Sequence, residues 1–142
     1  MTQHLDWIVA SAVSGCVWGT LAVVLTESSD AWPGVIASPL IGLMLGFAIR
    51  PFRDGDWGGR MLISLVGLYF AVGLFGVFTG AARGLSAGWI LLAPGMINDV
   101  VLLWASLTLG GLVVLLWPLS LVNHLAIWSL QRRADSRGVR AS

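Results

Sequence analysis

Long charge-free stretches are the feature of this sequence that most limits how it can fold. They cover residues 7–26, 31–49, 61–82, 84–98 and 100–131. Only 11% of all residues are charged, whereas about a quarter are charged in a typical soluble domain. Because about 20 consecutive apolar residues form a helix that crosses a bilayer, we predict an all-α, multi-pass integral membrane protein.

Four helices are expected to cross the membrane as one bundle, at about residues 7–26, 34–50, 61–82 and 99–118. Together with residues 119–130 they would form a single transmembrane domain over residues 1–130. The last charge-free stretch is too long for one crossing, so this helix is expected to bend or leave the membrane at Pro118.

Prolines interrupt two further stretches of the sequence. Residues 85–97 are too short to cross and contain Pro94 and Gly95, so a short interfacial segment is expected before the last helix. Asn98 or Asp99 would then cap that helix at its N-terminus. Because Pro33 and Pro39 fall within or next to residues 31–38, the sequence does not decide whether that segment is helical.

Arginine placement predicts the orientation. Seven of the eight arginines fall on one side of the expected membrane, and Arg83 falls on the other. Since cytoplasmic loops are rich in basic residues, both ends are expected in the cytoplasm of a bacterial cell, with the protein in the inner membrane and residues 131–142 forming a basic tail. The candidates for lipid head-group contact or orientation are Arg50, Arg53, Arg60, Arg132 and Arg133.

Small residues recur at four-residue spacing in every expected helix. This spacing leaves a flat face on which a neighbouring backbone can pack closely. Packing within the bundle and contact with another subunit or a flat cofactor both fit the pattern. The residues are Ser11, Gly15, Gly19, Ser38, Gly42, Gly46, Gly76, Gly80, Ser106 and Gly110.

Residues 119–130 have an amphipathic pattern at helical period. Ser120, Asn123, His124 and Gln131 share the polar face. We expect this segment to lie along the cytoplasmic surface and to offer the polar residues to a partner. A straight continuation of the last helix is the alternative.

The sequence lacks the residues that common membrane chemistry needs. No ionisable side chain lies at mid-depth of an expected crossing, and no metal cluster or nucleophile–base pair is visible, so an enzyme and a metal site are not expected. His4 and His124 lie at different depths, which argues against an intrinsic haem; pigment, haem or lipid shared with partner chains stays open. A net charge of +1 gives no nucleic-acid footprint.

These observations predict a non-catalytic small membrane subunit that scaffolds, stabilises or assembles a larger membrane complex through small-residue helix faces and lipid and aromatic contacts. Membrane lipids and other integral membrane subunits are the expected partners. A component of a small transporter or channel is the first alternative. A membrane enzyme that uses an outer acidic cluster, formed by Glu27, Asp30 and Asp99, is the second.

Overall fold

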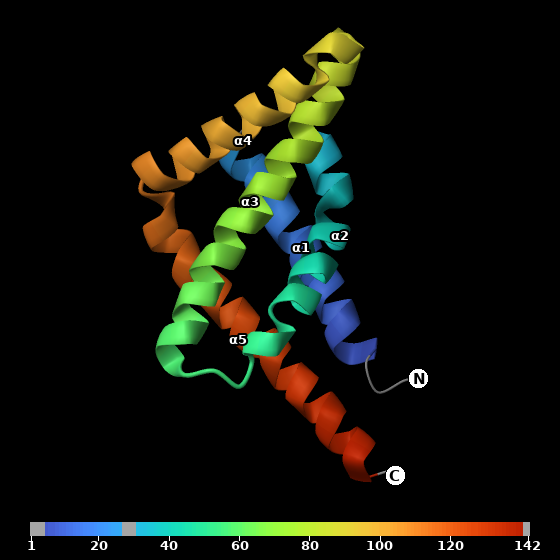
Figure 1. Ribbon diagram of the computed structural model, residues 1–142, viewed down its shortest axis with the longest axis vertical. Helices are drawn as coiled ribbons and strands as arrows, with labels where there is room; N and C mark the ends of the chain where they lie inside the picture. Colours follow the sequence, from blue (N-terminus) through green and yellow to red (C-terminus); the bar gives the residue numbers. More distant parts are fainter. Residues whose placement is uncertain (1–4, 27–30, 141–142) are drawn as a thin grey trace.

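The computed structural model describes residues 5–26 and 31–140, and Figure 1 shows that this part of the chain is built from helices. The elements are α1 (Leu5–Thr26), α2 (Trp32–Ala48), η3 (Arg50–Phe52), α3 (Trp57–Ala87), η4 (Trp89–Leu91), α4 (Leu92–Leu109) and α5 (Leu112–Arg140). Four helices, α1, α3, α4 and α5, are long and apolar enough to cross a membrane, whereas α2 is apolar but has 17 residues. The chain is therefore a helical protein of the multi-pass membrane type, as the charge-free stretches predict.

The helices run back and forth along one direction (Figure 1). α1 and α2 form an antiparallel pair, α3 runs beside them, and α4 and α5 together lead back to the end of the molecule at which α1 begins. α3 is central, because it packs against α2, α4 and α5, while α1 packs mainly on α2.

The structure settles the state of residues 32–38, which are part of α2. This helix begins at Trp32 with Pro33 in its first turn. Proline is favoured there because the missing N–H has no helical partner in any case. The helix also continues through Pro39.

The predicted single helix over residues 99–118 is wrong. The chain is broken at Gly110 and Gly111, and Pro118 lies inside α5. Gly111 has a φ of 70°, a conformation that glycine adopts without steric cost. Residues 119–130 therefore continue α5, which extends to Arg140 and into the predicted tail.

The predicted start of the last helix is also wrong. α4 begins at Leu92, so Asn98 and Asp99 lie within the helix and do not cap it. The segment expected to be interfacial contributes the end of α3, the short η4 and the first turns of α4.

Glycines let the helix pairs approach closely. A Cβ atom at Gly15 would overlap the Ser38 carbonyl of α2, and one at Gly42 would overlap the Ser11 carbonyl of α1. Gly80 of α3 faces the Gly95 backbone of α4 in the same way. Such backbone contacts are typical of helix packing in membranes.

Candidate functional site

The predicted small-residue faces lie mostly between helices of this chain. Six residues occupy the contact between α1 and α2, and two occupy the contact between α3 and α4. Ser106 lines a central cavity, and Gly110 lies in the exposed break between α4 and α5. The α1–α2 set is Ser11, Gly15, Gly19, Ser38, Gly42 and Gly46, and the α3–α4 set is Gly76 and Gly80.

The polar stripe predicted for partner docking faces the interior of the molecule. Ser120, His124 and Gln131 are 4%, 4% and 1% exposed, whereas Leu119 and Val122 on the other side of α5 are 54% and 64% exposed. This is the reverse of a helix on a soluble protein. The reason is that lipid surrounds a membrane helix, so its apolar face points outward.

Side chains of α5 complete the C-terminal end of α2. The amide of Gln131 donates to the Gly46 carbonyl at 2.9 Å, and the indole of Trp128 donates to the Ile49 carbonyl at 2.9 Å. The last carbonyls of a helix have no helical partner. Gln131 therefore gives the Gly46 carbonyl a partner, and Trp128 adds a second bond to the Ile49 carbonyl, which also accepts the Phe52 N–H.

Charged residues join the loop after α2 to the exit of α5. Arg50 and Arg53 donate to the carboxylate of Asp135, and Arg132 donates to Asp54. The hydrogen bond with Asp135, followed by that with Asp54, raises the pKa of the Arg53 guanidinium above its ordinary value. The hydrogen bond from Arg53 lowers the pKa of Asp54 below its ordinary 3.8.

The two other candidate lipid-contacting arginines differ from each other. Arg60 lies with its guanidinium carbon 6.0 Å from the ring centre of Trp128. Its Nε atom is buried without a hydrogen-bond partner among the described residues. Arg133 is exposed on α5 and forms no ion pair within the described part of the chain. Of the five arginines, Arg133 is thus the one most open to an outside anion.

The outer acidic cluster is described only in part. Asp99 is buried between α3 and α4, where the guanidinium of Arg83 donates to its carboxylate at 2.8 Å. Glu27 and Asp30 lie outside the described residues, as does His4. Asp99 therefore acts in this structure as one partner of an ion pair between two helices.

A polar network surrounds the break between α4 and α5. The hydroxyl groups of Tyr69 and Thr108 are 2.8 Å apart, and the Trp104 indole donates to the Tyr69 carbonyl at 2.9 Å. Tyr69 lies near the middle of the charge-free part of α3. These bonds therefore place the break at about the middle of the membrane-crossing length of α3. This network was not predicted, although the chain's single tyrosine within an apolar stretch was a usable signal.

The break itself is exposed and incompletely hydrogen-bonded. Gly110 N–H donates to Ser106, and Gly111 N–H donates to Thr108. Among the described residues, no hydrogen bond reaches the carbonyls of Leu109 and Gly110. Both glycines are exposed.

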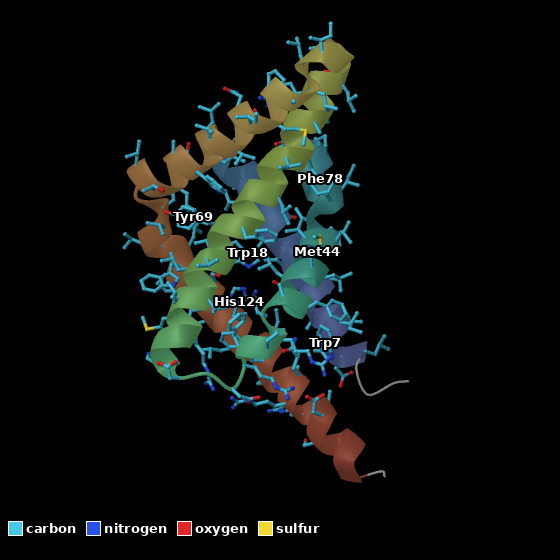
Figure 2. The ribbon with its side chains drawn as sticks, in the orientation of Figure 1. Trp7, Trp18, Met44, Tyr69, Phe78 and His124 are labelled. Carbon is cyan, nitrogen blue, oxygen red and sulfur yellow. The ribbon has the colours of Figure 1, made fainter. Side chains whose placement is uncertain are left out.

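A partly open cavity of about 360 Å³ lies between the five α-helices. Its walls are mostly apolar and include Trp18, Phe75 and Leu107. The polar groups Ser120, Asn123 and His124 reach it from α5. Figure 2 shows His124 and Trp18 in the interior of the bundle.

The described residues contain no group of three or more His, Cys, Asp or Glu side chains that could hold a metal ion. No protein family, curated protein or solved structure matches this chain.

Proposed function

We propose that this chain is a non-catalytic subunit that stabilises a larger membrane protein complex in a bacterial inner membrane, with both ends of the chain in the cytoplasm. The observation that carries the proposal is the exposed break at Gly110 and Gly111. Lipid cannot donate hydrogen bonds to the carbonyls of Leu109 and Gly110, and irregular backbone is not left facing lipid within the hydrocarbon region. A helix of another subunit packed over the break would supply donors and exclude lipid.

The surroundings of the break fit such a partner. Leu109 is 88% exposed and Val114 is 71% exposed, so an apolar surface flanks the polar backbone. The exposed hydroxyl of Thr108 lies beside it. The matching surface is a membrane helix that carries a serine, threonine or asparagine among apolar residues, because hydroxyl and amide groups bond across helices in membranes.

Site-specific crosslinking in native membranes tests this assignment. A photoreactive benzoylphenylalanine placed at Leu109 reports on the break. The same residue placed at Ile36, which is 78% exposed on α2, is the matched control. We expect the Leu109 probe to give one discrete adduct that is heavier by the mass of a second protein chain.

The control probe should give lipid-sized additions. The same second chain should also co-purify with the unmodified protein in mild detergent. The proposal is wrong if the Leu109 and Ile36 probes give the same lipid adducts and the protein is a monomer in every detergent tested.

A further inference from the structure

His124 is a buried polar side chain without a hydrogen-bond partner. It is 4% exposed, its Nδ1 atom has no partner, and no described residue bonds to its other ring nitrogen. A neutral imidazole has one N–H donor and one bare nitrogen acceptor. Burying an unpaired ring nitrogen is costly, so Nδ1 calls for a partner beyond the described residues.

The cavity beside His124 has a volume and a wall composition that suit a small, mostly apolar molecule. Ligand sites in proteins typically measure about 300–1,000 Å³ and are lined by apolar and aromatic side chains with a few polar groups. The cavity of about 360 Å³ has this composition. A Cβ atom at Gly67 would lie 2.9 Å from Cε1 of His124, so the glycine of α3 leaves room for the ring.

The polar side chains of the cavity walls are neutral, and His124 and Asn123 on α5 are the ones with groups other than hydroxyls. The hydroxyls of Ser120 and Ser38 already donate to the carbonyls of Ser64 and Val35. The imidazole of His124 and the half-buried amide of Asn123 have no such bond, and the hydroxyls of Ser14 and Ser106 also line the cavity. Within the described residues, no Asp, Glu or Arg side chain lines the cavity. A charged ligand group would therefore lose its hydration without gaining a counter-ion.

We infer that this cavity binds a neutral, mostly apolar molecule whose hydroxyl or carbonyl group forms a hydrogen bond with His124. A hydroxyl group can pair with either ring nitrogen, whereas a carbonyl requires the N–H. Membranes supply both chemistries, as long-chain alcohols and as quinones. This site is independent of the partner subunit proposed above, because every wall residue belongs to this chain.

Binding to the purified chain in lipid nanodiscs tests the inference. Three probes share a ten-carbon chain and differ in the head: 1-decanol, decylbenzoquinone and decylbenzene. Native mass spectrometry at graded probe concentrations gives the stoichiometry and the dissociation constant. We expect one molecule of decanol or decylbenzoquinone to bind roughly three- to ten-fold more tightly than decylbenzene, the difference that one net hydrogen bond provides.

Three variants locate the site. His124→Phe keeps a ring and removes both nitrogens, so it should abolish the preference for the polar probes. Val122→Phe places the same side chain on the exposed face of α5 and should leave the preference unchanged. Ala71→Phe fills the cavity and should prevent binding of all three probes.

Equal affinity of the unmodified protein for all three probes would overturn the inference without any variant. Unchanged binding in Ala71→Phe would place the molecule elsewhere and would overturn it as well. The two polar probes separate the chemistries, because a carbonyl site favours decylbenzoquinone and a hydroxyl site favours decanol.

Discussion

The carboxylate of Asp99 is buried between α3 and α4, and the guanidinium of Arg83 reaches it from a more exposed position. The two side chains are 6% and 48% exposed, with 2.8 Å between the paired atoms. Removing one partner of a buried pair is costly chiefly because the remaining charge stays buried. Removing Arg83 and removing Asp99 should therefore lower the stability by different amounts.

Arg83→Gln should destabilise the protein by about 1–3 kcal/mol, because it leaves the Asp99 charge buried without a counter-ion. Asp99→Asn should cost about 1 kcal/mol or less, because the freed Arg83 can turn to water or lipid head groups. Thermal unfolding of both variants in mild detergent measures the difference. Equal losses, or a larger loss for Asp99→Asn, would contradict this account of the pair.

The polar residues of α5 show a property that the sequence does not determine, which is the direction in which a helix face points. The spacing of Ser120, His124 and Gln131 places them on one helix face, and the structure has them on one face. Their pattern alone does not say whether that face points to water or inward. The direction depends on contacts with Ser64 and Gly46, which lie more than 50 residues away along the chain.

At the level of elements, the break between α4 and α5 lies at one of two positions where the sequence could interrupt the last apolar stretch. Gly110–Gly111 and Pro118 both interrupt the same apolar stretch, and the prediction favoured Pro118. Proline within a membrane helix removes one backbone hydrogen bond and is tolerated there. Glycine can adopt a positive φ, a conformation that commonly ends a helix. The glycine pair was therefore the stronger signal for a helix end.

The loop after α2 is joined to α5 by ion pairs. Arg53 in this loop pairs both with Asp54 beside it and with Asp135 on α5. Arg53→Gln should lower the stability by about 1 kcal/mol or less, since the pairs are partly exposed. Arg133→Gln is the matched control, because it removes the same charge from α5 at a residue without an ion pair among those described. Thermal unfolding at low ionic strength should separate the two variants, and 1 M salt should reduce the difference.

The same pair of variants has a pH dependence. The pKa of Asp54 is lowered in the folded protein from its ordinary 3.8, so its contribution to stability is present above pH 3.8 and is lost as the pH falls through the lowered value. The loss in Arg53→Gln should accordingly be full at pH 7 and smaller well below pH 3.8. A loss that does not change over this range would show that the Arg53–Asp54 contact contributes nothing.

At the level of the whole molecule, the charges mark the two ends and the apolar faces cover the sides. The loop at residues 49–56 and the exit of α5 lie at one end, and the turn between α3 and α4 lies at the other (Figure 1). The charge-free stretches were sufficient to predict a helical membrane protein. They could not predict the cavity, because its walls come from five helices whose tilts depend on contacts between distant residues.

The proposed orientation predicts which end of the molecule is accessible from outside the cell. In a Cys16→Ser background, which removes the single exposed cysteine, Ser86→Cys and Asp56→Cys place matched exposed thiols at opposite ends. Because the end near Asp56 carries the arginine-rich loop, the positive-inside rule assigns it to the cytoplasm. A membrane-impermeant maleimide should label Ser86→Cys in intact spheroplasts and Asp56→Cys only after lysis. The reverse pattern would show that the arginines do not set the orientation, and labelling of both positions before lysis would show that the two ends do not lie on opposite sides of the membrane.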